Sequence, residues 1–169
     1  MELHLFNMES PSFIRELRFL SLRTKDGISQ TKSTPLSKSY TDGVMAVCIS
    51  HALPIGIDIE KMRRRSPETM MHFIHTFTTF EIKDTPLHLN EEWFYRAWTA
   101  MESYFKLMGG GFSTKKNFVL DLERKSIYQE GKKVAWLEHF VVKDLMICLC
   151  SNQVFSKDNL RITTHGLRP

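Results

Sequence analysis

Two carboxylates, Asp58 and Glu60, lie in the otherwise apolar sequence IGIDIE at residues 55–60. Isoleucine alternates there with small or acidic residues at period two, which predicts a short buried strand with its isoleucines on one face. The two acids then share the other face, about 7 Å apart by the strand rise. Like charges on such a strand repel each other and are costly to bury. A hard divalent cation such as Mg²⁺ would remove both costs, whereas the plain alternative is an edge strand with two solvated acids.

Basic residues follow this strand and account for part of the formal net charge of +4. Four cations occur within five residues, and two lysine pairs come later: Lys61, Arg63, Arg64 and Arg65, then Lys115, Lys116, Lys132 and Lys133. Such clusters suit a polyanionic small molecule, an acidic protein or nucleic acid. A merely solvated basic surface explains the lysine pairs, but it explains less well four cations beside two acids.

Length and composition indicate one globular domain, or two small lobes that share a core. The chain has 169 residues, of which 42% are hydrophobic and 25% charged. No apolar run approaches the roughly 20 residues that span a bilayer, and the first residues lack the cationic start of a secretory signal. Three cysteines are an odd number, and Cys148 and Cys150 lie in an apolar strand. We therefore expect a cytoplasmic protein without disulfide or zinc.

The elements around the acidic strand follow from local patterns. We expect strands at residues 2–6 and 44–49, an amphipathic helix at 13–22 and a polar loop at 23–39, with the strand at 44–49 able to pair with the acidic strand. Four residue patterns farther along predict antiparallel strands at 118–122, 126–129, 134–142 and 145–150. The polar residues from Ser156 onward are expected to be loosely attached.

Three helices are predicted between these groups of strands. Ser66 caps a helix that runs to about Thr76, and residues 78–81 form a capping box for a short helix that ends before Pro86. Asn90 caps the strongest helix, which continues to Met108, where a run of three glycines stops it.

The long helix carries an acid among aromatic residues. Its apolar stripe consists of Trp93, Ala97, Ala100, Met101, Tyr104, Leu107 and Met108. On an adjoining face lies Glu102, one turn from Lys106. Glu102 is therefore a candidate for chemistry, although a helical ion pair between these two residues, worth a few tenths of a kcal/mol, is the simpler explanation.

Three segments in this order resemble the 4'-phosphopantetheinyl transferase superfamily, of the holo-acyl-carrier-protein synthase and surfactin-synthetase-activating type. They are IGIDIE at 55–60, FTTFE at 77–81, and WTAMESYFK at 98–106 with GGGFS at 109–113. They resemble the family's G-[IV]-D-x-E strand, F-[ST]-x-x-E helix start and W-x-x-K-E-[AS]-x-x-K helix. The resemblance covers about residues 36–152. It implies an α+β fold with an antiparallel sheet packed against a long helix and a shortened N-terminal half. The lobes would be 1–54 and 55–152, with a tail at 153–169.

The resemblance also implies a reaction and a site. Family members transfer the 4'-phosphopantetheine arm of coenzyme A to a serine of an acyl or peptidyl carrier protein, with Mg²⁺, and release 3',5'-ADP. By position, Asp58, Glu60 and Glu102 correspond to the metal-binding acids. Glu102 is also the candidate base, and Lys106 lies near the reacting phosphate. The expected coenzyme contacts are Lys38, Lys61, Lys106, Gly110 and Ser113. The expected partner is an acidic carrier protein.

The chain departs from the family pattern at two positions. Met101 stands where the family has a lysine before the glutamate, about 100° around the helix from Glu102. A lysine on that flank would reach the pyrophosphate, whereas methionine there either leaves a phosphate cation missing or packs in the core. Lys38, between Ser37 and Ser39, stands where longer members have histidine. The lysine keeps a charge but lacks the planar ring.

Two other classes of function remain as alternatives. A non-catalytic relative would bind a carrier protein or a nucleotide without transfer, and Met101 together with the short N-terminal part motivates it. A nucleic-acid-binding module would explain only the basic clusters, because the sequence has no groove-reading motif or aromatic–basic platform. We therefore expect neither nucleic acid nor membrane as a partner.

Overall fold

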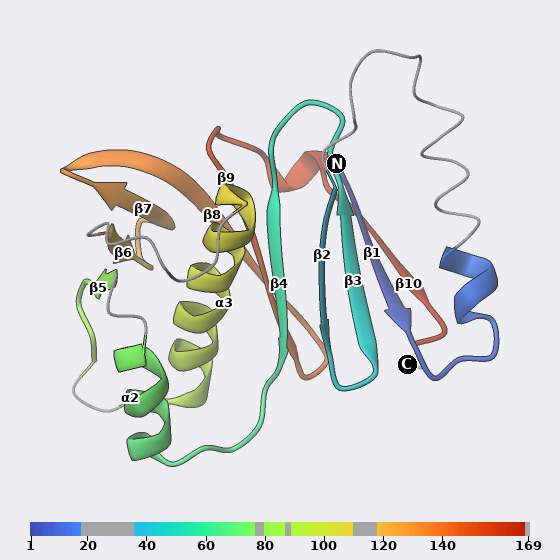
Figure 1. Cartoon of the computed structure of the whole chain (residues 1–169), viewed down its shortest axis with the longest axis horizontal. Coiled ribbons are helices and arrows are strands. Elements are labelled where there is room, and N and C mark those ends of the chain that lie inside the picture. The colour runs from blue at the N-terminus through green and yellow to red at the C-terminus, as the bar shows by residue number, and fades with distance from the viewer. Residues whose placement is uncertain (18–35, 77–79, 87–88, 110–117, 168–169) are drawn as a thin grey trace.

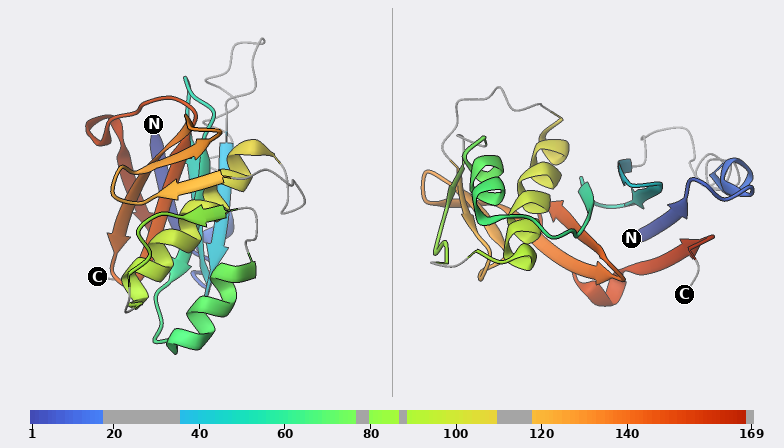
Figure 2. Two further views of the ribbon diagram at one scale, coloured as in Figure 1. Left: turned by 90° about the vertical axis from the view of Figure 1, so that its left-hand side faces the viewer. Right: turned by 90° about the horizontal axis from the view of Figure 1, so that it is seen from below.

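Two β-sheets lie side by side, and the helices α2 (Pro67–Thr76) and α3 (Glu91–Met108) cover one face of the larger sheet (Figures 1 and 2). The computed structural model describes residues 1–17, 36–76, 80–86, 89–109 and 118–167. Both sheets are mostly antiparallel, so the α+β class is confirmed. Within the described ranges, no helix is both long and apolar enough to cross a bilayer.

The smaller sheet has four strands in the order β10-β1-β3-β2. They are β1 (Glu2–Asn7), β2 (Leu36–Thr41), β3 (Val44–Ile49) and β10 (Arg161–His165). β10 runs parallel to β1, while β1–β3 and β3–β2 are antiparallel. The expected loop at 23–39 was therefore wrong for 36–39, and the expected loose tail was wrong for 161–165. Both segments are polar, and each is held as a strand by hydrogen bonds to an apolar neighbour. β2 pairs with β3 across a turn, and β10 pairs with β1, which is distant in sequence.

The larger sheet has six strands in the order β4-β9-β8-β7-β6-β5. They are β4 (Gly56–Lys61), β5 (Phe80–Ile82), β6 (Phe118–Asp121), β7 (Ser126–Gln129), β8 (Lys132–Val142) and β9 (Leu145–Ser151). β6 to β9 form the predicted antiparallel meander. A 3₁₀ turn at Lys157–Asn159 precedes β10.

Two expectations for this sheet were wrong. β4 pairs with β9 and does not pair with β3, because every residue of β9 is buried and this strand needs a hydrogen-bonding neighbour on each side. Residues 80–82 form β5, parallel to β6, in place of the short helix. Phe80 packs there against Tyr104 and Phe118, and burial of this ring outweighs the local capping signal. Residues 78 and 79 of the capping box lie outside the described residues.

Both predicted long helices begin and end as their sequence signals indicate. The Ser66 hydroxyl accepts a hydrogen bond from the Thr69 amide at the start of α2. The Asn90 side chain accepts from the Trp93 amide at 2.8 Å, which caps α3. Gly109 ends α3 in the left-handed conformation, with φ of 65°. Residues 13–17 are helical, as predicted for the start of the helix at 13–22, whose remainder lies outside the described residues.

The core has one part on each side of β4. Ile57 and Ile59 point away from α3 and are fully buried among residues of both sheets, including Leu5 and Leu149. On the helix side, the apolar stripe of α3 packs on the meander, as expected for all its members except Met108, which is 56% exposed at the helix end. The opposite faces of β4 therefore separate an apolar core from a helix-facing polar site.

Gly56 lets α3 approach β4 at backbone distance. A Cβ atom at this position would lie 1.9 Å from the Ser103 carbonyl oxygen and 2.7 Å from the Leu107 amide nitrogen. Both obstructing atoms belong to the helix backbone, so no side-chain rotation could relieve the clash. The glycine of IGIDIE is therefore required by the packing of the helix on the strand.

We predict that Gly56→Ala destabilises the protein by about 3 kcal/mol or more, because overpacking against backbone forces the helix away from the strand. Thermal or urea unfolding measures the change. Gly131→Ala is the control: this glycine has φ of 74° and open space around it, so its substitution costs about 1 kcal/mol of backbone strain alone. Equal effects of the two substitutions would contradict the packing argument.

Candidate active site

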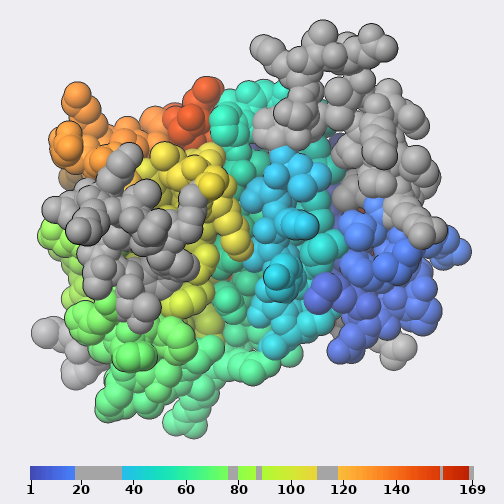
Figure 3. Space-filling view, in the orientation of Figure 1, coloured from blue at the N-terminus to red at the C-terminus, as the bar shows by residue number. Residues whose placement is uncertain are grey.

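The predicted acidic residues lie where β4, α3 and β2 meet. β4 carries Asp58 and Glu60 on the face opposite Ile57, as predicted. α3 presents Glu102 and Lys106 to this face, and β2 lies beside β4 without pairing with it (Figure 3, with β2 in cyan next to α3 in yellow). The structure thus brings together four residues that are separated by up to 48 positions in sequence.

Asp58 is the centre of a small buried network. Its side chain is 5% exposed, and one of its oxygens, Oδ1, accepts hydrogen bonds from Lys106 Nζ at 2.6 Å and from the Ser39 hydroxyl at 2.8 Å. Lys106 Nζ also donates to the Ser39 hydroxyl at 2.8 Å. The second oxygen of Asp58 is buried without a hydrogen-bond partner among the described residues. Lys106 is therefore paired with Asp58, and the described residues show no ion pair between Lys106 and Glu102.

Three carboxylates crowd this site, and the pKa of each is raised mainly by burial. The pKa of Asp58 is raised because burial outweighs the attraction of Lys106. Burial is also the main cause that raises the pKa of Glu60, and the charge of Asp58 adds to it. The pKa of Glu102 is raised by burial and then by Asp58, while Lys106 opposes this. The cluster therefore has more negative charge than its own lysine neutralises, and it favours binding a proton or a cation.

Two hydroxyl residues of β2 belong to the site and were not predicted. Ser39 contacts Asp58, and the Thr41 hydroxyl donates to Glu60 Oε2 at 3.3 Å. Ser37, two residues earlier, accepts from the Ile57 amide at 3.0 Å. Alternation of hydroxyl residues at 37, 39 and 41 was the available signal. It was missed because the segment was interpreted as a loop, and period two has meaning only for a strand.

The remaining predicted coenzyme-binding residues have different positions. Lys38 is exposed on the side of β2 opposite Ser37 and Ser39. Lys61, at the end of β4, pairs with Asp144 at 3.3 Å. Gly110 and Ser113 lie outside the described residues. Of the predicted residues, the structure therefore gathers Asp58, Glu60, Glu102 and Lys106, and it leaves Lys38 and Lys61 at the surface around them.

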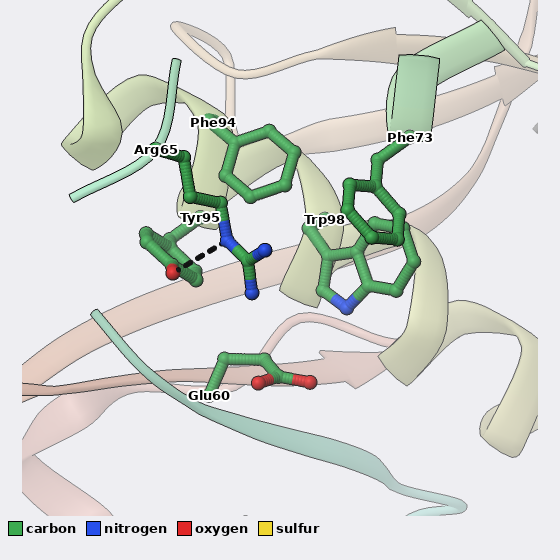
Figure 4. A pocket seen from close by; sticks show the side chains of 6 residues that line it. All are labelled: Glu60, Arg65, Phe73, Phe94, Tyr95 and Trp98. Carbon is green, nitrogen blue, oxygen red and sulfur yellow. Dashed lines mark hydrogen bonds between the residues drawn. The ribbon is translucent and has the colours of Figure 1, made fainter. Parts of the chain in front are cut away.

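A cavity of about 220 Å³ adjoins the acidic cluster on the Glu60 side (Figure 4). Its lining combines two charged residues with four aromatic rings: Glu60, Arg65, Phe73, Phe94, Tyr95 and Trp98. The indole nitrogen of Trp98 faces the Glu60 carboxylate and opposes the rise of its pKa, which links the rings to the carboxylates. The acidic cluster is therefore open to a cavity that holds a guanidinium group.

The chemistry of these residues fits a magnesium ion. Carboxylate oxygens are the protein ligands that Mg²⁺ takes, and the buried second oxygen of Asp58 has a free acceptor position. Within the described ranges, no three acidic, cysteine or histidine side chains are close enough, as placed, to surround one ion. The ammonium group of Lys106 holds the position of a cation beside Asp58. We therefore expect the carboxylates to draw together only when an ion is bound.

A comparison with protein families agrees with this geometry. The sequence pattern of the 4'-phosphopantetheinyl transferase superfamily matches residues 54–164, well over half of the chain. The matched range includes β4, α2, α3 and the whole meander. A search of curated protein sequences finds no match. The chain belongs to the 4'-phosphopantetheinyl transferase superfamily.

Met101 lies in the core. Its side chain is fully buried in the cluster that α3 forms with the meander, which also contains Leu120 and Ile127. Of the two placements considered for this residue, the phosphate-facing flank is wrong and the core is correct. The reason is the orientation of α3: contact of Ser103 with Gly56 directs Glu102 and Lys106 toward β4 and turns Met101 toward the other strands.

We predict that Met101→Lys lowers the melting temperature strongly, because it places a charge in a dry core at a cost of several kcal/mol. Met108→Lys on the same helix is the control: Met108 is 56% exposed, and its substitution should change stability by less than about 0.5 kcal/mol. Differential scanning calorimetry of the two variants decides the matter. A stable Met101→Lys protein would show that the side chain reaches solvent or the phosphate site.

We also predict that the metal-free protein loses stability as the pH rises above the ordinary carboxylate range. The raised pKa values of Glu60 and Glu102 mean that the folded protein binds more protons than the unfolded chain in the window between the ordinary and the raised values. The free energy of unfolding therefore falls as the pH rises through that window. Glu102→Gln should make this fall shallower in unfolding measurements with EDTA. The exposed Glu123→Gln should not, and an equal slope in all three proteins would contradict the crowding of charges.

Proposed function

We propose that this protein transfers the 4'-phosphopantetheine arm of coenzyme A to a serine of an acyl or peptidyl carrier protein, with Mg²⁺, and releases 3',5'-ADP. One observation carries the proposal: Asp58, Glu60 and Glu102 converge at the contact of β4 with α3, beside Lys106. Membership in the superfamily supports transfer of phosphopantetheine in general. The holo-acyl-carrier-protein synthase type is the specific activity that we infer.

The carboxylates would hold the metal through their oxygens. When bound, Mg²⁺ would neutralise the pyrophosphate of coenzyme A and polarise the reacting phosphate. Asp58 offers its unpartnered Oδ2, while Ser39 and Thr41 fix Asp58 and Glu60 by hydrogen bonds to their other oxygens. These hydroxyls come from the neighbouring sheet, so the smaller sheet has a part in shaping the site.

The reaction requires one proton acceptor and one phosphate-binding cation. The serine hydroxyl of the carrier attacks the phosphorus next to the pantetheine arm, and the bond from that phosphorus to the oxygen of 3',5'-ADP breaks. Glu102 takes the serine proton, directly or through water. Its raised pKa brings it closer to neutral pH, where a general base works best. The Lys106 ammonium group would move from Asp58 to the transferred phosphate and stabilise its negative charge.

Mass spectrometry of an apo carrier protein tests this function. With coenzyme A and Mg²⁺, the wild-type protein should add one phosphopantetheine to the carrier, which is a mass increase of about 340 Da by stoichiometry. Asp58→Asn should reduce the rate by about 100-fold or more, since a metal-binding or charge-stabilising group contributes about that much. The exposed carboxylate Glu123, changed to Gln, serves as the control.

Two results of this assay would reject parts of the proposal. Near-normal turnover by Asp58→Asn would remove the metal role of the acidic strand. Binding of coenzyme A or carrier without any mass change, for several apo carriers, would favour a relative that binds without transfer. The burial of Met101 in the core removes one motive for that alternative, because a side chain at this position does not face the phosphate site.

The basic segment after β4 is our candidate for carrier docking. Arg63 and Arg64 are exposed, and Arg63 pairs with Asp42 across the two sheets. Acidic helices on a carrier protein would complement this surface. Since exposed pairs are screened over about 10 Å at 0.1 M salt, the KM for the carrier should rise with ionic strength. Arg64→Ala should weaken that dependence, and a KM independent of salt in the wild-type protein would contradict docking by charge.

A further inference from the structure

Arg65 is held in a fixed position by aromatic residues. Its Cζ atom lies 5.2 Å from the centre of the Phe73 ring, 5.9 Å from that of Phe94 and 5.8 Å from that of Tyr95. Its Nε donates a hydrogen bond to the Tyr95 hydroxyl at 2.9 Å (Figure 4). Contacts between a guanidinium and ring faces are favourable, more so where water is partly excluded. The position of this charge is therefore set before any ligand arrives.

Tyr95 in turn fixes the backbone that carries Arg65. The side chain of Tyr95 is buried, with 1% exposed, and its hydroxyl accepts from the Arg63 amide at 3.0 Å and lies 3.3 Å from the Arg63 carbonyl oxygen, to which it donates. One residue of α3 thus positions both the segment after β4 and the guanidinium. An arginine that is ordered in advance loses less conformational entropy when it binds an anion.

The outer edge of the guanidinium is available to a ligand. Among the described residues, Arg65 makes a hydrogen bond only through Nε, and it forms no ion pair within 4.0 Å with Glu60. Both residues nevertheless line the same cavity of about 220 Å³. A cavity of this volume has room for several waters, or for a phosphate group with fewer waters.

The position of Arg65 differs from those of its neighbours in sequence. Arg63 is paired with Asp42, and Arg64 is exposed, so neither faces the acidic cluster. Arg65 approaches Glu60 from the side of the cavity, while Lys106 contacts Asp58 from α3. The fixed cations therefore lie on two different sides of the carboxylates. A second organic cation in the cavity would be repelled by Arg65, which already covers the ring faces, so the geometry favours an anionic ligand.

We propose that Arg65 binds the pyrophosphate of coenzyme A on the Glu60 side of the site, as a second phosphate-binding cation beside Lys106. This inference rests on the proposed function. A guanidinium can donate two parallel hydrogen bonds to phosphate oxygens, and its charge is permanent. Arg65 is thus a substrate-binding residue of this chain that acts together with Lys106.

The affinity of coenzyme A, measured by calorimetry with Mg²⁺ and without carrier protein, tests the inference. Arg65→Met should weaken binding by tenfold or more, as expected for loss of a charged hydrogen-bond donor. Arg65→Lys, which keeps the charge without the fork, should show a smaller loss. The exposed arginine Arg161, changed to Lys, is the matched control and should bind within twofold of the wild-type protein. The melting temperature of each variant is measured alongside, and Arg65→Lys decides the matter if Arg65→Met does not fold.

A second ligand locates the contact on the coenzyme. Arg65→Met should weaken the binding of 3'-dephospho-coenzyme A by the same factor as that of coenzyme A, because both ligands contain the pyrophosphate. If the substitutions weaken the binding of coenzyme A but not that of 3'-dephospho-coenzyme A, Arg65 contacts the 3'-phosphate and the inference is wrong. Unchanged affinity for both ligands in both Arg65 variants would also overturn it. These results leave the proposed function intact if the wild-type protein modifies its carrier. No binding of coenzyme A by the wild-type protein would overturn the function and the inference together.

Discussion

The close contact between α3 and β4 at Gly56 is the constraint on which the site depends. Because the Ser103 carbonyl occupies the space of a missing side chain, the helix cannot slide or rotate without a backbone clash or a void. Glu102 precedes Ser103, and Lys106 follows one turn later, so both are directed at the acidic face of the strand. The same contact turns Met101 into the opposite core. One packing distance therefore fixes which helix residues can take part in chemistry.

The site is assembled at a cost in stability. Three carboxylates with raised pKa values share a half-buried volume with one lysine. Ser39 and Thr41 offset part of this cost by hydrogen bonds, and Lys106 holds Asp58. The remaining excess of negative charge favours the binding of a proton or a cation. A site with this charge imbalance binds a divalent ion more readily than one already neutralised by its own residues.

The parts of the fold that were predicted correctly depend on local signals. The caps at Ser66 and Asn90, the glycine stop at Gly109 and the alternation in β4 each involve neighbouring residues only. The errors were in β2, β5, β10 and the partner of β4, where pairing with distant strands decides the structure. A strand whose own pattern is polar or short has no local signal that could outweigh such pairing.

The site followed the same division. Asp58, Glu60, Glu102 and Lys106 were found from their spacing and from resemblance to the family. Their pairing was not: an ion pair one turn apart on the helix was the simpler alternative considered, and Lys106 instead contacts Asp58 across the interface. Ser39, Thr41 and the aromatic support of Arg65 were also missed, since each connects segments that only the folded chain brings together. Contacts of this kind join segments that are distant in sequence, so they can be identified only in the folded structure.

A crystal grown with Mn²⁺ and coenzyme A tests the central claim most directly, because Mn²⁺ replaces Mg²⁺ at oxygen sites and is visible by anomalous scattering. We predict an anomalous peak bound by oxygens of Asp58, Glu60 and Glu102 at about 2.1–2.2 Å, with Lys106 moved from Asp58 to a phosphate. A coenzyme bound with no metal peak near β4, and with Lys106 still paired to Asp58, would contradict the account.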